Sequence, residues 1–199
     1  KTFPGVVALD GVNLDIYKGQ VHALLGENGA GKSTLMNILY GLYHQDSGEI
    51  FLKGENYIHN TPKNAILHGI GMVHQHFMLI PNFTVLENII LGQTSPHPPS
   101  LEKEYFRNEV LKVADKFGIT VNLDLLVEEI SVGMQQKIEI LKALYKGAEL
   151  LILDEPTAVL TPQESLDLFK MLDDLNKKGT TIIFISHKLN EVMQISDRI

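Results

Sequence analysis

The sequence predicts an α/β fold with a parallel sheet, an N-terminal antiparallel β region and an inserted helical subdomain. Three observations lead to this prediction. The continuous apolar runs VHALL, LLIL and IIFI, at 21–25, 150–153 and 182–185, have the length and composition of buried strands. Segments with helical spacing separate these runs, so the strands should pair in parallel. A glycine-rich loop joins the first run to a helix, which is typical of parallel-sheet folds that bind phosphate.

Residues 1–75 are predicted to form the first part of the core. Asp-Gly and Lys-Gly steps divide the stretch 6–20 into short apolar pieces, and the stretch 48–58 repeats this pattern around a second Lys-Gly step. Short apolar pieces between turn residues predict short, partly antiparallel strands. A helix of about ten residues should start at Lys32. The run IGMVHQ should form a further buried strand that ends at Gln75.

Residues 76–147 are predicted to form a mainly helical subdomain. Thr84 and Glu87 have the spacing of a capping box, which marks a helix N-terminus. The segment 93–100 is rich in proline and has no apolar periodicity, so we expect a surface loop there, and helical spacing resumes after it. A Lys-Gly step marks the end of the last helix of this segment.

Residues 148–199 return to alternating strands and helices and complete the core. An amphipathic helix, closed by a glycine, lies between the apolar runs LLIL and IIFI. The chain begins with Lys1 rather than Met, and we expect the natural protein to extend beyond both ends.

The composition is that of an ordinary globular chain, with 199 residues of which 44% are hydrophobic. The formal net charge is −7 and no lysine and arginine cluster stands out, so general binding to nucleic acid is not expected. The absence of cysteine excludes disulfides, thiol catalysis and thiolate metal sites. No apolar run approaches the roughly 20 residues that cross a bilayer, so we expect any membrane role to be peripheral.

The segment GENGAGKST fits the phosphate-loop pattern G-x-x-x-x-G-K-[ST]. It consists of Gly26, Glu27, Asn28, Gly29, Ala30, Gly31, Lys32, Ser33 and Thr34. The glycines allow backbone N–H groups to point at phosphate oxygens, Lys32 can reach the terminal phosphates, and the Ser33 hydroxyl can bind Mg²⁺. The alternative is a glycine turn with an incidental lysine. The position between a predicted strand and a predicted helix favours the phosphate loop instead.

Asp154 and Glu155 follow the predicted strand LLIL. An aspartate at the end of a buried strand beside a phosphate loop can hold the hydration shell of Mg²⁺. Glu155 is then placed to polarise a water for in-line attack on a γ-phosphate. By itself, an acidic pair before Pro156 is as consistent with a solvated turn, and only the phosphate loop favours catalysis.

Three more residues are weaker candidates. Gln75 ends a predicted strand, where its amide can reach Mg²⁺ or the attacking water, although a lone glutamine is more often structural. His187 follows the run IIFIS and is a candidate for contact with the γ-phosphate, although most lone histidines have no catalytic role. Phe3 is a candidate for stacking on an adenine ring, although a phenylalanine beside Pro4 is more often a packing residue.

The stretch ISVGMQQ, residues 130–136, runs from a Ser-x-Gly step into a predicted helix. The free N–H groups and the positive dipole end of a helix favour an anion, and Ser131 and Gly133 allow one to approach closely. The phosphate loop already supplies one anion site. A second such element requires either a second anion or a second copy of the protein.

Taken in order, GENGAGKST, VHQ, ISVGMQQ, LLILDEP and ISH resemble the motifs of the ATP-binding cassette (ABC) ATPase domain, over nearly the whole chain. The resemblance implies a phosphate-loop NTPase (RecA-like) nucleotide-binding core in residues 1–75 and 148–199, with the signature motif in the helical subdomain 76–147. It also implies that two cassettes associate head to tail. The helix start at Ser131 then binds the γ-phosphate that the partner's phosphate loop holds.

The resemblance assigns a role to each matching position. Phe3 matches the adenine-stacking aromatic residue, and residues 26–34 match the phosphate loop. Gln75 matches the glutamine that couples the active site to the transmembrane partner, and Ser131 and Gly133 match the signature residues.

The acidic strand end and the residue after the last strand also match. Asp154 corresponds to the Mg²⁺-linked aspartate, Glu155 to the catalytic base and His187 to the switch histidine. Lys32, Gln75, Glu155 and His187 are therefore the candidate catalytic residues, and Ser33, Gln75 and Asp154 the candidate metal ligands. ATP and Mg²⁺ are the implied cofactors.

Two departures from the family pattern stand out. The commonest signature reads LSGGQ, whereas Val132 and Met134 replace its first glycine and its glutamine. The serine and the second glycine remain, so the phosphate contact should remain as well. After the catalytic glutamate the family normally has an aspartate, where this chain has Thr161, and this puts communication between the two nucleotide sites in doubt.

The segments SVGMQQKIEILKAL and DEPTAVLTPQE are most similar to the import ATPases for simple sugars and nucleosides. In that group two cassettes are commonly fused, and this chain would be the first. The implied partners are transmembrane permease subunits, a second cassette in the same chain or in a homodimer, and, indirectly, an extracytoplasmic solute-binding protein. The implied location is the cytoplasmic face of the cell membrane.

Three alternatives belong to other classes. A soluble ABC-type ATPase that acts on ribosomes or DNA is disfavoured by the acidic charge and by the stretch 76–92, which resembles the coupling region of transporters. A degenerate cassette that binds ATP without hydrolysis is disfavoured because Glu155 and His187 are both present. A small-molecule kinase is disfavoured because the mechanism of phosphate-loop kinases does not require the element ISVGMQQ.

Overall fold

The computed structural model describes residues 1–58, 61–94 and 102–199. The strands are β1 (Thr2–Phe3), β2 (Val6–Val7), β3 (Val21–Leu25), β4 (Phe51–Leu52), β5 (Glu55–Asn56), β6 (Ile70–Val73), β7 (Leu150–Asp154) and β8 (Thr181–Ser186). The helices are α1 (Lys32–Tyr40), α2 (Pro62–Leu67), α3 (Val85–Ile90), α4 (Lys103–Phe117), the 3₁₀ turn η1 (Val127–Glu129), α5 (Val132–Tyr145), α6 (Pro162–Lys177) and α7 (Leu189–Ile195). None of the helices in these ranges is both long and apolar enough to span a bilayer.

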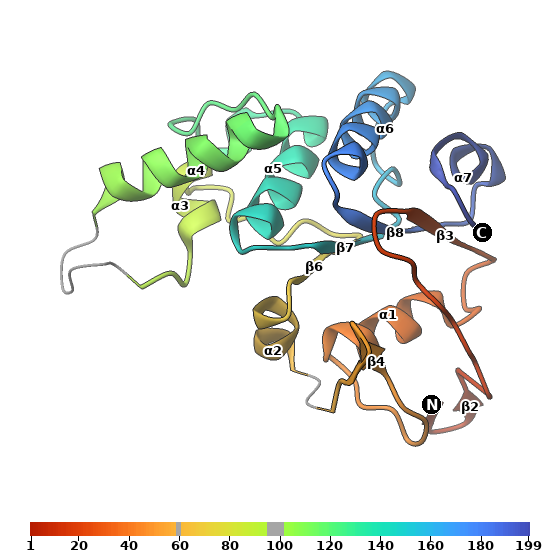
Figure 1. The fold of residues 1–199 in the computed structure, drawn as a ribbon. Helices are drawn as coiled ribbons and strands as arrows, with labels where there is room; N and C mark the ends of the chain where they lie inside the picture. Colours follow the sequence, from red (N-terminus) through yellow and green to blue (C-terminus); the bar gives the residue numbers. More distant parts are fainter. Residues whose placement is uncertain (59–60, 95–101) are drawn as a thin grey trace.

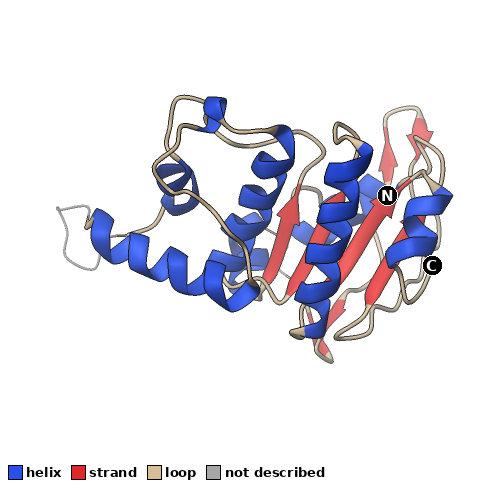
Figure 2. Ribbon diagram, turned by 90° about the horizontal axis from the view of Figure 1, so that it is seen from above, coloured by secondary structure: helices blue, strands red, loops and turns tan. Residues whose placement is uncertain are grey.

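A four-stranded parallel sheet in the order β3-β8-β7-β6 lies at the centre of the molecule. Helices α5, α6 and α7 lie on one face of it, and α1 and α2 lie on the other (Figure 1). The predicted α/β fold with parallel pairing is therefore confirmed. The helices of the middle segment gather to one side of the sheet, beside β6 (Figure 2).

Both faces of the sheet are apolar because successive strand residues point to opposite sides. In β8, Ile182 and Phe184 belong to the larger core beneath α5, α6 and α7. Ile183 and Ile185 belong to the smaller core, with Met36 of α1. Each of these strand residues is fully buried, so a one-residue slip of register would exchange the two cores.

The N-terminal part contains two short antiparallel pairs, as predicted. The β1–β2 and β4–β5 pairs each contain two residues per strand. The prediction of several strands in the stretch 6–20 is wrong beyond Val7, because no strand occurs at 8–20. Gly11 and Gly19 adopt positive φ angles there, of 55° and 73°, and interrupt an extended path.

The middle segment contains α3, α4 and α5, as the helical spacing predicts, and also the 3₁₀ turn η1 between α4 and α5. The capping box of Thr84 and Glu87 is present at the start of α3, with both hydrogen bonds formed. Residues 95–100 of the predicted proline-rich loop lie outside the described residues. The last helix, α5, also packs on β6, where a Cβ atom added to Gly71 would lie 3.0 Å from the Cβ of Ala143.

The strand β6 ends at Val73, two residues before the predicted end at Gln75. Its last pairing is between Val73 and Leu153, and beyond it the chain bends away from β7. Gln75 therefore lies in a bend after the strand rather than in the sheet.

A buried asparagine holds the turn between this bend and α3. Asn88 is completely buried, and its side-chain Oδ1 accepts a hydrogen bond from the Ile80 N–H at 2.7 Å. Its Nδ2 donates to the carbonyl oxygens of Ile80 and Thr84, each at 3.1 Å. One side chain thus supplies the partner of the Ile80 N–H and adds a second hydrogen bond to two carbonyl oxygens that already accept the backbone N–H groups of Phe83 and Asn88.

We predict that Asn88→Ala lowers the free energy of unfolding by about 1–3 kcal/mol, because the Ile80 N–H loses its hydrogen-bond partner. Urea unfolding followed by circular dichroism measures this change. The control is Asn190→Ala, on the exposed surface of α7, which should change stability by less than about 0.5 kcal/mol. Equal effects of the two substitutions would show that the turn does not depend on Asn88.

Candidate functional site

The candidate site lies at the carboxyl ends of β3, β7 and β8. The loop 26–31 follows β3, Asp154 ends β7, and His187 follows β8. Carboxyl ends of parallel strands share one edge of the sheet, and this edge is where open α/β sheets bind ligands. The topology therefore brings candidate site residues that are far apart in the sequence to the same edge of the sheet.

The loop 26–31 depends on glycine at two positions. Gly29 and Gly31 have φ angles of 86° and 90°, which side chains disfavour. A Cβ atom on Gly31 would also lie 2.5 Å from the carbonyl oxygen of Ala8, so the N-terminal segment packs directly on the loop. The loop ends at α1, whose first N–H groups and positive dipole end favour an anion.

Lys32 lies across the loop. Its ammonium group donates hydrogen bonds to the carbonyl oxygens of Gly26 at 2.7 Å and Glu27 at 2.8 Å. These contacts hold a positive charge beside the loop backbone. The arrangement fits the predicted role of Lys32 toward phosphate groups.

Ser33 and Asp154 lie together, as the sequence predicts. The Ser33 hydroxyl donates to Oδ1 of Asp154 at 3.1 Å. Burial raises the pKa of Asp154, and the hydrogen bond from Ser33 partly offsets this effect. A hydroxyl and a carboxylate are oxygen ligands of the kind that Mg²⁺ takes from proteins when phosphates complete its shell, so these two residues fit the predicted ion.

Glu155 and His187 form the second pair at this edge. Nδ1 of His187 lies 3.2 Å from Oε1 of Glu155. Glu155 has a φ angle of 47°, which is rare for a residue other than glycine, and its N–H donates to the carbonyl oxygen of Ile185 at 3.1 Å. Backbone strain of this kind costs about 1–3 kcal/mol and often occurs at functional sites.

Gln75 is not joined to this group. Its side chain is exposed, and within the part of the chain that the structure describes it makes no hydrogen bond to Ser33 or Asp154. Its position after the edge strand β6 does place it at the same end of the sheet as Asp154.

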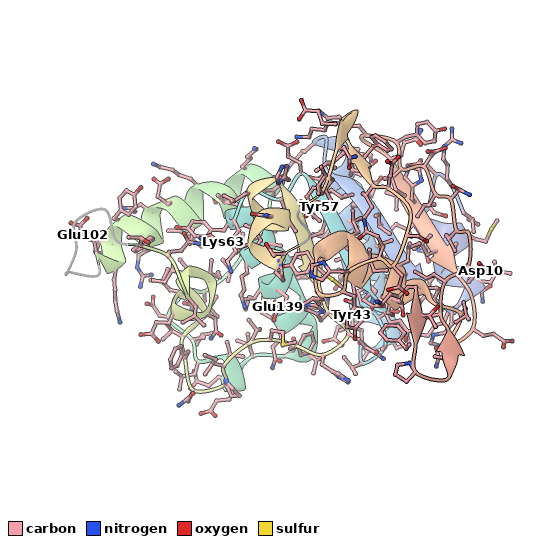
Figure 3. All side chains as sticks on the ribbon, turned by 90° about the horizontal axis from the view of Figure 1, so that it is seen from below. Asp10, Tyr43, Tyr57, Lys63, Glu102 and Glu139 are labelled. Carbon is pink, nitrogen blue, oxygen red and sulfur yellow. The ribbon has the colours of Figure 1, made fainter. Side chains whose placement is uncertain are left out.

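Phe3 lies in β1 and packs on an aromatic residue that the sequence analysis missed. The rings of Phe3 and Tyr43 meet edge to face, with centroids 5.4 Å apart. Tyr43, labelled in Figure 3, follows the C-terminal end of α1 and is 42% exposed. The periodicity gives no signal for this contact, because 40 residues separate the two rings along the chain.

The helix start at Ser131 makes hydrogen bonds within this chain. Ser131 caps α5, and its hydroxyl accepts the Met134 N–H at 3.3 Å. The Gly133 N–H donates to Oε1 of Glu164 at 3.0 Å. Among the described residues this helix start makes no hydrogen bond to the loop 26–34. Glu164 was missed, although Thr161 and Glu164 have capping-box spacing in the sequence.

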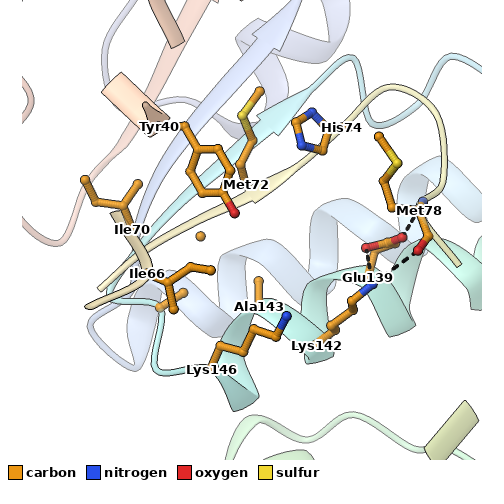
Figure 4. A pocket seen from close by; sticks show the side chains of 12 residues that line it. Tyr40, Ile66, Ile70, Met72, His74, Met78, Glu139, Lys142, Ala143 and Lys146 are labelled. Carbon is orange, nitrogen blue, oxygen red and sulfur yellow. Dashed lines mark hydrogen bonds and ion pairs between the residues drawn. The ribbon is translucent and has the colours of Figure 1, made fainter. Parts of the chain in front are cut away.

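A cavity of about 220 Å³ lies between β6, α1, α2 and α5 (Figure 4). Its lining includes no residue of the loop 26–34. At one side, Glu139 of α5 accepts the Met78 N–H at 2.6 Å, and Lys142 donates to the Met78 carbonyl oxygen at 3.2 Å. The segment after Gln75 is thereby tied to α5, whose N-terminus carries Ser131.

Comparison with known proteins gives one consistent result. The family model described as ABC transporter matches residues 9–158. The nucleoside import ATP-binding protein NupA of Lactococcus lactis is 51% identical over 199 residues, and the guanosine import ATP-binding protein NupO of Bacillus subtilis is 53% identical over 199 residues. Each alignment covers 100% of this chain and 39% of the relative, so the chain spans about two fifths of the length of these relatives.

Solved structures agree with the family match. The ADP conformation of an ATP-binding cassette of an ABC transporter superposes with a TM-score of 0.86 at 30% identity, covering 99% of this chain and 82% of the other. A nucleotide-free cassette from an ABC transporter superposes with a TM-score of 0.84 at 29% identity, with the same coverage. The loop 26–31 at the edge of the parallel sheet and the family match lead to the same conclusion. The chain belongs to the ABC transporter family and has the fold of its ATP-binding cassette.

Proposed function

We propose that this chain binds Mg-ATP and hydrolyses it to drive the import of a small solute, a nucleoside or a simple sugar. One observation carries the proposal. The structure brings Ser33 within 3.1 Å of Asp154, and Glu155 within 3.2 Å of His187, at the sheet edge that follows the phosphate loop. A metal-binding pair and an acid–base pair beside a phosphate loop are the groups that hydrolysis of a γ-phosphate requires.

Each residue of the site has its own role in ATP hydrolysis. The loop 26–34 binds the phosphates with its N–H groups and Lys32, and Mg²⁺ held by Ser33 and Asp154 would neutralise phosphate charge. Glu155 accepts a proton from the water whose oxygen bonds to the γ-phosphorus, and the bond to the bridging oxygen of ADP breaks. His187, beside Glu155, contacts the γ-phosphate side of the site. Phe3 stacks on the adenine, with Tyr43 supporting its ring.

The proposed transport role follows from the relatives. Proteins named for the import of nucleosides, guanosine, glucose and ribose are 45–53% identical to this chain. We assign this chain the same kind of partners: transmembrane permease subunits, served by a solute-binding protein outside the cell. Gln75 and the segment that Glu139 ties to α5 then lie between the site and the permease, on the cytoplasmic face of the membrane.

The helix start at Ser131 serves a second cassette. In this proposal Ser131 and Gly133 bind the γ-phosphate held by the facing cassette, either a second copy or a fused second half. ATP binding closes the pair and hydrolysis reopens it. In this scheme the core, 1–75 with 148–199, and the helical subdomain 76–147 act as separate units.

We predict that Glu155→Gln lowers the steady-state rate of ATP hydrolysis by about 100-fold or more, because the general base is lost. ATP binding, measured by titration with a fluorescent nucleotide, should stay within about twofold of the unmodified protein. The control is Glu55→Gln in the exposed β4–β5 hairpin, which should retain full activity. Undiminished hydrolysis by the Glu155 variant would rule out this residue as the base.

We predict that Asp154→Asn raises the Mg²⁺ concentration for half-maximal hydrolysis by about 10- to 100-fold, because a charged oxygen near the ion is lost. Because burial raises the pKa of Asp154, the Mg²⁺ affinity of the unmodified protein should begin to fall, on acidification, at a higher pH than an ordinary aspartate would give. Asp174→Asn, an exposed change on α6, is the control. An unchanged Mg²⁺ requirement would place the ion elsewhere.

We predict that Mg-ATP doubles the mass of the Glu155→Gln protein in light scattering, and that adding Ser131→Asp prevents this. Aspartate caps a helix as well as serine does, but it places a negative charge where the partner's phosphate would bind. Thr61→Asp makes the same change at the N-cap of α2 and should leave association intact. Association that survives Ser131→Asp would exclude the helix start from the interface.

A further inference from the structure

The carboxylate of Glu164 occupies the N-terminus of α5. Its Oε1 accepts the Gly133 N–H at 3.0 Å, and a Cβ atom on Gly133 would lie only 2.7 Å from this oxygen. Its Oε2 accepts the Thr161 N–H at 3.0 Å and the Thr161 hydroxyl at 2.9 Å. Glu164 therefore belongs to the first turn of α6 and reaches across to the first turn of α5.

The side-chain carboxyl group of Glu164 is ionised at neutral pH. Hydrogen bonds from Thr161, with further ones from the Gly133 N–H and the Ser131 hydroxyl, hold the pKa of Glu164 below its usual range. The positive dipole end of α5 favours the same charge. The carboxylate thus accepts the Gly133 N–H, one of the two groups that bind a phosphate in the proposed function, and lies beside the other, Ser131.

Two anions cannot share these donors. The Gly133 N–H has one hydrogen, which a carboxylate oxygen accepts in this structure. A phosphate oxygen that accepts this N–H must displace the Glu164 carboxylate. The two groups are both negative, so they repel each other at hydrogen-bonding distances. Release of Glu164 would also break the hydrogen bond that joins α5 to α6.

We propose that Glu164 is an internal competitor for the phosphate site at the start of α5, so that ATP-driven closure requires its carboxylate to leave Gly133. The inference rests on the proposed function, in which Ser131 and Gly133 bind the γ-phosphate of a facing cassette. Only the fraction of molecules with Glu164 displaced is competent to close, and this raises the ATP concentration that closure needs. The contact joins the start of α5 to the start of α6.

The test is the ATP dependence of hydrolysis by the full-length protein that carries this segment, with Glu164→Gln. Glutamine also serves at the third position of a capping box, so the fold of α6 is kept while the charge is removed. The concentration of Mg-ATP at half-maximal rate should fall by about 2- to 5-fold, the size expected for one charge at a helix N-terminus. The maximal rate should not fall.

The matched control is Asp167→Asn, which removes one negative charge from an exposed position one turn further along α6. It should leave the ATP dependence unchanged, and urea unfolding should show that both variants are folded. An unchanged or higher ATP requirement in Glu164→Gln would overturn the competition and leave Glu164 as a structural contact. If the unmodified protein shows no hydrolysis that Glu155→Gln abolishes, the proposed function fails, and this inference fails with it.

Discussion

The parallel pairing of β7 with β8 is the constraint on which the site depends. Asp154 is paired with Ile185, and the N–H of Glu155 donates to the same residue's carbonyl oxygen at 3.1 Å. His187 follows two residues later, so the register alone brings it to Glu155. A slip of one residue would bury the wrong side chains on both faces of the sheet and separate the pair. The two apolar cores fix the register of β7 and β8, and they therefore fix the positions of Glu155 and His187 as well as the fold.

Helix α5 connects the regions that the proposed function requires to move together. Its N-terminus contacts Glu164 of α6, its middle binds Met78 through Glu139, and its C-terminal half packs on β6. A displacement of α5 therefore reaches both the segment after Gln75 and the start of α6. In the proposed function this is a physical route between the site and a permease, and it runs through hydrogen bonds that the carboxylates of Glu139 and Glu164 accept from backbone N–H groups.

Two of the departures from the family pattern, Met134 and Thr161, have structural explanations. Met134, in place of the signature glutamine, packs against the larger core, where an apolar side chain is favoured. Val132 is 37% exposed at the first position of α5 and nothing in the fold opposes it. Thr161 caps α6 and forms a capping box with Glu164. Threonine and aspartate both cap helices, so the replacement keeps the helix start and removes one charge.

The sequence by itself determined the α/β class, the phosphate loop and the acidic pair after β7, because local spacing and strand-to-loop order carry that information. The sequence pattern wrongly predicted strands within 8–20 and placed the end of β6 two residues late. Strand ends depend on pairing partners, which periodicity does not reveal. Only the tertiary structure decided that Glu155 meets His187 and that Glu164 reaches Gly133. The last two residues are 31 positions apart and lie on different helices, and their contact follows from how α5 and α6 pack. Contacts of this kind depend on three-dimensional packing, which no local pattern encodes.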